Sequence, residues 1–541
     1  MGKKTSARTL LVLILISGLF YQPVPAEHRS IEEFSQQVND LLHRPKFRST
    51  SWGIQILDPD NDEILYAKNA DKLFVPASNT KLFTTVTAFE KLGPDFRFKT
   101  NAFITGSPSA SGVVDGDLIL EGRGAFNFSN LIHTAYSPTA ILTDLSIQIA
   151  AKGIRQIEGD LIANDAYFPH THQPVVVRKY ARRGRRKGKV VNKTVTSVVC
   201  PLAPQDGVIR IAVSPGGAPG QKVTVFTAPE ARYLQVENRG ITGPRRAKRT
   251  LTVTKKGSNG IVISGKLPVS SSGYHCTLPI EDPPKFMAAL FKDILAQHGV
   301  KVVGSVRSCY GRAQCGLARE YWQSVAVHES LPLVDIIQVI NKESHNSMAE
   351  LLLRSLGSEV RGEGTLEAGL AVEADFLQEI GVNPSQANLV DGSGLSKENL
   401  VTPQAVTRLL KHVYQREYFP SFFGTLAING VDGTLRRRMD QPELRERIHA
   451  KTGTLSNSIT LSGYVALERN RRILFSIMAN RLTISAHSAR RMIDQICDLI
   501  VGHFGSDDGT SPLQDAIIRT AKNEAAGHLH MSGPASYAHR N

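Results

Sequence analysis

The sequence has few cysteine and tryptophan residues. Its 541 residues include two tryptophans and five cysteines, the latter at positions 200, 276, 309, 315 and 497. These cysteines match neither a disulfide framework nor a zinc site, although Cys309 and Cys315 are placed so that they could close a small loop. Hydrophobic residues make up 41% of the chain and charged residues 21%. This balance is typical of a folded globular protein, and the length predicts two or three domains.

Beyond the first 20 residues, no segment reads as a membrane span. Lys3, Lys4 and Arg8 precede an apolar run at 10–20, and small residues follow up to Ala26. This order is typical of a secretory signal peptide, which we expect at 1–26. The run is short for a bilayer-spanning helix, so an uncleaved anchor is the less favoured alternative. The sequence therefore predicts an exported protein of the periplasm or cell envelope.

Acidic residues are under-represented, and the formal net charge is +15. Much of the excess lies in 178–193, which holds nine basic residues and no acidic one. This segment is either a solvated loop or a site attracted to an anionic envelope polymer or a membrane surface. Nucleic acid is not expected as a partner, because an exported chain rarely meets it and no aromatic stacking platform accompanies the charge.

The chain divides into an interrupted α+β domain and a large insert. Residues 51–69 read as strand, turn and strand, and 461–468 with 472–480 read as a hairpin. Between 98 and 321, short β-like runs alternate with turn residues, which predicts a mostly-β insert of two subdomains. We therefore assign 27–97 and 322–505 to one domain with an antiparallel sheet, and 506–541 to a loose tail. Apolar periodicity predicts its helices at 75–93, 330–344, 347–357, 364–381, 402–415 and 485–500.

Three short motifs carry the chemistry. Ser-x-x-Lys occurs once, at Ser78 and Lys81; Ser-x-Asn occurs once, at Ser344 and Asn346; and Lys-Thr-Gly occurs once, at 451–453. Alone, the first is an ordinary helix cap and a surface lysine, but all three in this order predict a serine nucleophile. On a helix, positions i and i+3 share a face, so Lys81 can reach the hydroxyl of Ser78.

The chemistry of these residues suggests a separate role for each of them. Lys81 must be neutral to accept a proton, and burial together with the nearby cation of Lys451 lowers its pKa. Ser344 would pass a proton to the leaving amine, and Asn346 would hold a substrate amide. The backbone N–H groups of Ser78 and Thr454 can form an oxyanion hole. Lys451 and Thr452 suit a substrate that ends in a free carboxylate.

These residues resemble those of the active-site serine enzymes that recognise penicillin. With the stretches 340–354, 389–403 and 451–467, and with the long insert, the chain is similar to D-alanyl-D-alanine carboxypeptidase/endopeptidases of the penicillin-binding protein 4 type, the class C low-molecular-mass penicillin-binding proteins. The resemblance covers about 45 to 500. It implies a transpeptidase-like fold, activity on the D-alanine-containing peptides of peptidoglycan, and covalent inhibition by β-lactams.

The resemblance also assigns roles to individual residues. Ser78 would be the acylated nucleophile and Lys81 its base, with Ser344 as the further catalytic residue. The substrate-binding residues would be Asn346, Lys451, Thr452, Gly453, Thr454, Lys397 and Asp165.

This chain departs from the family pattern at positions 397 and 345. The family usually has arginine where this chain has Lys397, a residue that helps to hold a diamino-acid carboxylate, and lysine gives one contact where arginine gives a fork. His345 replaces the commoner Asp or Asn of Ser-x-Asn, and we expect its side chain to point away with little effect.

Asp165 either lines the substrate groove from the insert or has a structural role. Asp391 and its neighbouring glycines are expected to hold a tight turn.

Alternatives remain open at this point. A β-lactamase-like hydrolase would use the same motifs, and a wall-binding scaffold would retain the site and work through its basic insert. The sequence has neither Gly-x-Ser-x-Gly nor His-Glu-x-x-His, which argues against an α/β-hydrolase and a zinc peptidase. We expect no metal and no cofactor.

Overall fold

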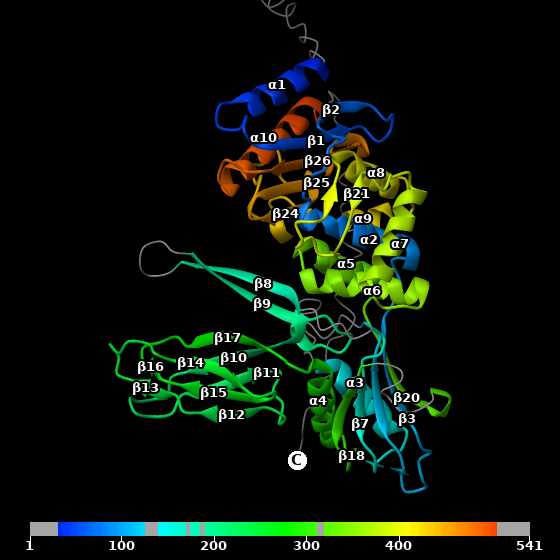
Figure 1. Cartoon of the computed structure of the whole chain (residues 1–541), viewed down its shortest axis with the longest axis vertical. Helices are drawn as coiled ribbons and strands as arrows, with labels where there is room; N and C mark the ends of the chain where they lie inside the picture. The colour runs from blue at the N-terminus through cyan, green and yellow to red at the C-terminus, as the bar shows by residue number, and fades with distance from the viewer. Residues whose placement is uncertain (1–30, 125–138, 169–173, 184–189, 311–318, 506–541) are drawn as a thin grey trace, which may run out of the picture.

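The computed structural model describes residues 31–124, 139–168, 174–183, 190–310 and 319–505. The expected signal peptide at 1–26 and tail at 506–541 lie outside the described residues. Figure 1 shows two halves stacked along the long axis of the molecule. Within the described ranges, no helix has both the length and the apolar character needed to cross a membrane.

A six-stranded antiparallel sheet forms the centre of the upper half. Its strand order is β2-β1-β26-β25-β24-β23, and neighbouring strands all run antiparallel. β1 pairs with β26 over its whole length, so the two ends of the chain build one sheet. This confirms the predicted α+β class and its antiparallel sheet. The strands are β1 (Ser51–Leu57), β2 (Ile64–Lys68), β23 (Ala427–Ile428), β24 (Ile448–Leu455), β25 (Ser458–Ala466) and β26 (Arg472–Asn480).

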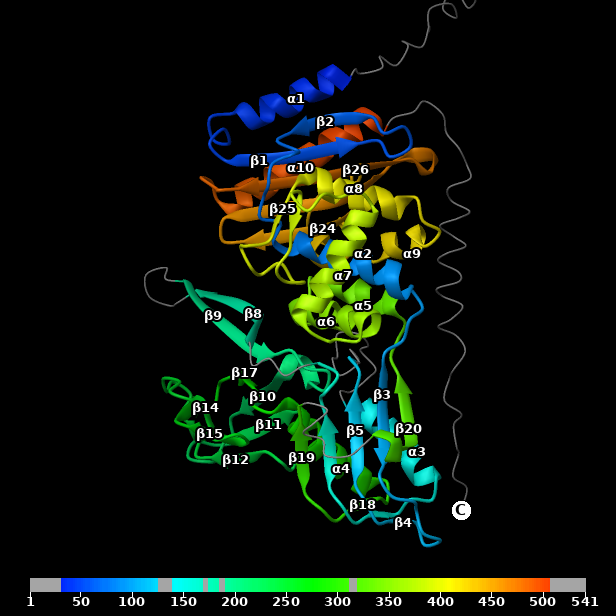
Figure 2. The ribbon, with the colours of Figure 1, turned by 45° about the vertical axis from the view of Figure 1, so that its right-hand side comes forward.

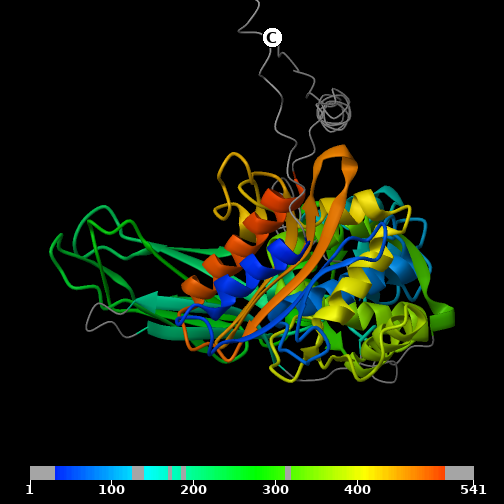
Figure 3. The ribbon, with the colours of Figure 1, turned by 90° about the horizontal axis from the view of Figure 1, so that it is seen from above.

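Helices cover both faces of this sheet. One face packs against α1 (Ile31–His43) and α10 (Ala486–Phe504), which lie side by side in Figure 3. The other face buries an apolar cluster shared with six helices. These are α2 (Thr80–Leu92), α5 (Leu333–Lys342), α6 (Asn346–Arg361), α7 (Leu366–Glu379), α8 (Pro403–Tyr414) and α9 (Phe419–Gly424). A two-stranded ribbon, β21 (Ala387–Asn388) with β22 (Leu400–Val401), lies between α7 and α8 in the chain.

The helix boundaries follow local capping chemistry. The helix predicted at 402–415 is α8, where Thr402 Oγ1 accepts the Ala405 N–H at 3.0 Å. The helix predicted at 364–381 is α7, where Thr365 Oγ1 accepts the Ala368 N–H at 2.9 Å. Each cap satisfies one of the N–H groups that the first helical turn leaves free. The sequence analysis missed α1, although its apolar residues recur at helical spacing.

The insert leaves and re-enters the upper half through two adjacent strands. β3 (Lys99–Ile104) carries the chain away after α2, and β20 (Gln323–Glu329) brings it back, paired antiparallel with β3. Figure 2 shows both strands below the upper half, with β3 running away from it and β20 running toward it. The sequence predicts the end of the insert at residue 321, but β20 belongs to the insert sheet, so that boundary lies after Glu329. A short strand has the same local pattern whichever sheet it joins, because its pairing partner lies far along the chain.

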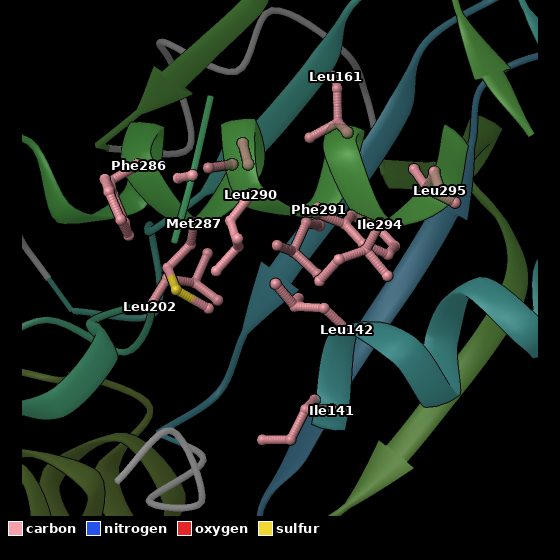
Figure 4. Close-up of a cluster of buried hydrophobic side chains, with 14 of the residues drawn as sticks. Ile141, Leu142, Leu161, Leu202, Phe286, Met287, Leu290, Phe291, Ile294 and Leu295 are labelled. Carbon is pink, nitrogen blue, oxygen red and sulfur yellow. The ribbon is translucent and has the colours of Figure 1, made fainter. Parts of the chain in front are cut away.

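The inner part of the insert is a mixed sheet covered by helices. Its order is β19-β7-β5-β3-β20, and α3 (Ala140–Ala151) and α4 (Pro283–Gln297) pack against it. Figure 4 shows α4 pointing Phe286, Leu290 and Phe291 into this core. Each such buried side chain contributes ~1.5–3 kcal/mol to folding. The other strands here are β5 (Leu118–Gly122), β7 (Leu161–Asn164), β19 (Val306–Cys309), β4 (Val113–Val114), β6 (Gln156–Ile157) and β18 (Lys301–Val302).

The outer part of the insert consists of small sheets. They have the orders β11-β10-β17, β12-β15-β14 and β13-β16, and their buried residues join the same apolar cluster as the inner part. The strands are β10 (Val208–Ser214), β11 (Thr224–Ala228), β12 (Gln235–Asn238), β13 (Ile241–Gly243), β14 (Thr252–Lys256), β15 (Gly260–Ser264), β16 (Lys266–Pro268) and β17 (Tyr274–Pro279).

The basic segment forms a projecting hairpin. β8 (Pro174–Arg183) pairs antiparallel with β9 (Val190–Val198) and extends away from the body in Figure 1. Its turn, 184–189, lies outside the described residues. The backbone is therefore a paired ribbon on both sides of the turn, where one interpretation of the sequence expected a loop.

Two further contacts stabilise the insert. Cys309 is disulfide-bonded, and Cys315, its expected partner, lies outside the described residues. At the joint with α6, Glu359 Oε1 accepts hydrogen bonds from Arg123 Nη2 at 3.2 Å and from the Tyr167 hydroxyl at 2.7 Å. This charge-assisted pair connects the insert to a helix that begins in the candidate active site.

Candidate active site

Ser78 lies in a short 3-10 turn directly before α2. The turn, η1 (Ala77–Asn79), has a left-handed φ of 49° at Ala77, which costs a non-glycine residue ~1 kcal/mol or more. Lys81 follows in the first turn of α2, and its Nζ lies 3.2 Å from Ser78 Oγ. The i, i+3 relationship inferred from the sequence therefore places the two groups within hydrogen-bonding distance.

Three hydroxyl side chains of β25 hold this strained turn. Ser458, Thr460 and Ser462 occupy alternate positions of the strand and so share one face. They hydrogen-bond Val75 O at 2.7 Å, Pro76 O at 2.8 Å and Asn79 Nδ2 at 2.6 Å, respectively. The sequence analysis did not identify them. The available signal was their alternation with apolar residues directly after Lys-Thr-Gly.

Lys81 is enclosed by three oxygen acceptors. Its side chain is 0% exposed. Besides Ser78 Oγ, its Nζ contacts Asn346 Oδ1 at 2.9 Å and the backbone oxygen of Ser393. Burial lowers the pKa of Lys81 to about 7, against the opposing charges of Asp391 and Glu350. A substantial fraction of Lys81 is therefore an uncharged amine near neutral pH.

Lys451 and Ser344 form a second buried pair beside the first. Ser344 joins α5 to α6 with a left-handed φ of 58°, and its Oγ lies 2.9 Å from Lys451 Nζ. Lys451 is 0% exposed, and burial, together with the charge of Lys81, holds its pKa well below the usual range. Lys81 therefore disfavours charge on Lys451, whereas the pKa of Lys81 itself is lowered by burial.

His345 has a capping role that the sequence did not predict. Its side chain is largely buried and caps α6, with Nδ1 accepting the Met348 N–H at 3.3 Å. The residues on either side of it, Ser344 and Asn346, contact the two lysines. A residue that we expected to have little effect therefore fixes the start of the helix that presents Asn346.

β24 presents an open edge next to Ser78. β23 pairs only with His449 and Ala450, so from Lys451 onward no strand among the described residues covers that edge. A Cβ on Gly453 would lie 2.1 Å from Thr460 Oγ1 and 3.1 Å from Ser78 N. Because glycine has no side chain, the backbone of Gly453 can lie close to the backbone amide of Ser78.

The remaining polar groups of β24 lie at its surface. Thr452 Oγ1 donates to Thr434 Oγ1 at 2.8 Å, and Thr454 Oγ1 accepts from Arg490 Nη2 at 3.3 Å. Thr454 is exposed. An edge of this kind can bind an extended peptide as an added strand.

A turn after Asp391 completes the site. Asp391 accepts the N–H groups of Gly394 at 2.6 Å and Ser396 at 2.7 Å, and Gly394 has a φ of 77°. A Cβ on Gly394 would lie 1.9 Å from Ala77 O. The predicted turn residues therefore press this loop against the Ser78 turn. The contact of the Ser393 oxygen with Lys81 was not predicted, because a backbone acceptor leaves no residue-type signal.

The structure does not bring two of the proposed site residues into this cluster. Lys397 is exposed on the loop that follows Asp391. Asp165 is 3% exposed at the end of β7 in the insert, where burial raises its pKa well above the usual value. Its neighbours there include Leu202 and Asp282, which corresponds to the structural alternative stated from the sequence.

Comparisons with known proteins agree with the site. The sequence matches the D-Ala-D-Ala carboxypeptidase 3 (S13) family over residues 34–500. It is 30% identical over 493 residues to the D-alanyl-D-alanine carboxypeptidase of Actinomadura sp. (strain R39), covering 88% of this chain and 87% of that protein. It is 24% identical to D-alanyl-D-alanine carboxypeptidase DacB of Haemophilus influenzae, covering 88% and 93%.

A solved structure shares the fold. Penicillin binding protein 4 (dacB) from Haemophilus influenzae aligns with a TM-score of 0.67 at 21% identity, over 87% of this chain and 99% of that one. The family and fold predicted from the sequence are therefore confirmed. The chain belongs to the D-Ala-D-Ala carboxypeptidase 3 (S13) family.

Proposed function

We propose that the protein is a serine D-Ala-D-Ala carboxypeptidase in which peptidoglycan stem peptides and β-lactams acylate Ser78. The observation that carries this proposal is the position of Lys81 Nζ, 3.2 Å from Ser78 Oγ in a fully buried setting. Membership of the S13 family supplies the reaction class.

The contacts of Lys81 suit it to act as the base. A neutral amine has two N–H donors and one lone pair. The acceptors Asn346 Oδ1 and Ser393 O take the two donors, which leaves the lone pair to face Ser78 Oγ. Lys81 then accepts the hydroxyl proton as Oγ attacks the carbonyl carbon before the terminal D-alanine.

The tetrahedral intermediate needs an oxyanion hole and a proton for the leaving amine. The N–H groups of Ser78 and Thr454 are the donors that we assign to the developing oxyanion. Ser344, hydrogen-bonded to Lys451, gives its hydroxyl proton to the amine nitrogen and receives in its place the proton that Lys81 took from Ser78, while the C–N bond breaks and D-alanine leaves. Lys81, again neutral, then accepts a proton from the water that attacks the ester carbonyl and returns it to Ser78 Oγ as the shortened peptide leaves.

The substrate would lie along the open edge of β24. Lys451 and the Thr452 hydroxyl bind the terminal carboxylate, and Asn346 Nδ2 donates to a substrate carbonyl. A bound carboxylate favours charge on Lys451, and that charge disfavours protonation of Lys81. Substrate binding therefore helps to keep the base free.

The same proposal includes a second activity, a further substrate contact, the site of action in the cell and a role for the basic hairpin. The enzyme would also cut peptide cross-bridges. Lys397 would contact the diamino-acid carboxylate of the stem peptide through one hydrogen bond. The residues at 1–26 would direct export to the periplasm or cell envelope. The basic hairpin around 178–193 would attract an anionic envelope polymer or a membrane surface.

One experiment tests the core of this proposal. Purified protein is incubated with a labelled penicillin, the adduct is located by mass spectrometry, and D-alanine release from a stem pentapeptide is then measured. We expect a slowly hydrolysed adduct on the Ser78 peptide, D-alanine release, and loss of both in Ser78→Ala. Rapid turnover of penicillin would instead favour a β-lactamase, and the absence of an adduct would contradict the assignment.

A further inference from the structure

Helix α6 contacts Lys81 by two routes. Asn346, at the start of the helix, accepts a hydrogen bond from Lys81 directly. Glu350, one turn later, accepts the Ser393 N–H at 2.9 Å, and the Ser393 carbonyl oxygen accepts from Lys81. Since positions i and i+4 share a helix face, one surface of α6 orients both acceptors of the lysine.

Glu350 is a buried group that the reaction steps above do not use. It is 3% exposed, so its charge can persist only if other groups compensate for the lost hydration. The Ser393 N–H and Arg354, one turn further along α6 and 6% exposed, provide this compensation. Burial and the negative charge of Asp391 raise the pKa of Glu350 above its usual value, and the hydrogen bond from Ser393 and the charge of Arg354 oppose that rise.

The other ionisable groups around Lys81 come from three further parts of the fold. Asp391 accepts three hydrogen bonds within its turn and adds a second negative charge. Lys451 approaches from β24. Glu373 on α7 is 1% exposed, and neither of its oxygens makes a well-formed hydrogen bond with a described residue. Burial raises the pKa of Glu373 to about 8, so its carboxyl is uncharged at neutral pH.

We propose that Glu350 is a positioning residue for the base: by accepting the Ser393 N–H it holds the backbone of Ser393 so that the carbonyl of the same residue orients Lys81, and its negative charge keeps Lys81 basic enough to deprotonate Ser78. This inference rests on the proposed function. Burial alone makes Lys81 neutral but also a weak base, and a general base works best when its pKa lies near the working pH. A nearby carboxylate opposes the effect of burial.

Three variants separate the charge of Glu350 from its hydrogen bond. Glu350→Gln keeps an oxygen acceptor for the Ser393 N–H and removes the charge. Glu350→Asp keeps the charge and withdraws the acceptor by one methylene group. Glu373→Gln is the matched control, because it replaces a buried carboxyl of the same cluster that is largely neutral around pH 7, where the rate is expected to fall.

The measurement is the rate constant for penicillin adduct formation on Ser78 from pH 5 to 9. This rate constant does not depend on the fraction of folded protein, so a partly unfolded preparation still reports the pH profile. For wild type we expect the rate to fall as the pH drops through about 7. Glu350→Gln should move this fall ~1 pH unit lower and reduce the plateau rate.

The other variants have distinct expected results. Glu350→Asp should leave the midpoint of the fall in place and lower the plateau, and Glu373→Gln should leave both near wild type. The inference would be overturned if Glu350→Gln left the pH midpoint of the rate unchanged. It would also be overturned if Glu350→Asp and Glu373→Gln shifted that midpoint as far as Glu350→Gln does. Failure of the proposed function is a different result, because wild type itself would then form no adduct on Ser78.

Discussion

Lys451 Nζ lies 2.9 Å from Ser344 Oγ, although 107 residues separate them in the chain. Lys451 projects from a strand of the central sheet, and Ser344 occupies the sharp turn between two helices. The neighbouring pair, Lys81 with Ser78, is local in sequence. The site therefore combines a pair that is local in sequence with a pair that is distant in sequence.

Replacing Lys81 should remove activity without loss of stability. Lys81→Met keeps most of the side-chain volume and removes the base, so we expect penicillin acylation to fall ~1000-fold. The melting temperature should be unchanged or higher, because a buried amine no longer loses its hydration. Lys91→Met, on the same helix with its amine paired to Glu379, is the control and should acylate normally.

The pH dependence of stability provides a second test of Lys81. Its pKa is about 7 in the folded protein, against an ordinary value of 10.5. Between these values the unfolded chain binds a proton that the folded protein does not, so the free energy of unfolding rises with pH in that window. In Lys81→Met this slope should be smaller by up to ~1.4 kcal/mol per pH unit. Urea unfolding at pH 7.5 and 9 measures it, and equal slopes would contradict the assigned pKa.

Gly453 should tolerate no side chain. In Gly453→Ala the new methyl group meets Thr460 Oγ1 and crowds the Ser78 amide, so we expect acylation to fall by at least ~100-fold. Gly502→Ala is a matched control on α10, since a Cβ there meets nothing within 4 Å. That control should keep full activity and gain ~0.5–1 kcal/mol of stability. Normal acylation by Gly453→Ala would show that the strand can move away.

His345 should be replaceable by another capping residue but not by alanine. His345→Ala removes the acceptor for the Met348 N–H and should cost ~1 kcal/mol of stability. Acylation should slow with it, because Ser344 and Asn346 adjoin the cap. His345→Asn, which can accept the same N–H, should restore both the melting temperature and the acylation rate. Equal rates for the two variants would show that the cap does not position the site.

The sequence was sufficient to predict the features that depend on residues close together in the chain. Helical periodicity and caps such as Thr402 predict the helices, since a side chain and the N–H groups that it caps lie within one turn. The Ser-x-x-Lys spacing predicts the contact of Lys81 with Ser78 for the same reason. The three motifs, by resemblance, also predicted the family.

Tertiary structure alone decided the contacts that no local pattern contains. Glu350 reaches Lys81 through a backbone carbonyl, and a carbonyl is present at every residue, so the sequence carries no mark of it. The place of β20 in the insert sheet and the burial of Asp165 depend on strands distant in the chain. Hydrogen-bond pairing and desolvation act on whatever groups the fold brings together, and they set the proton affinity of Lys81, the proposed base.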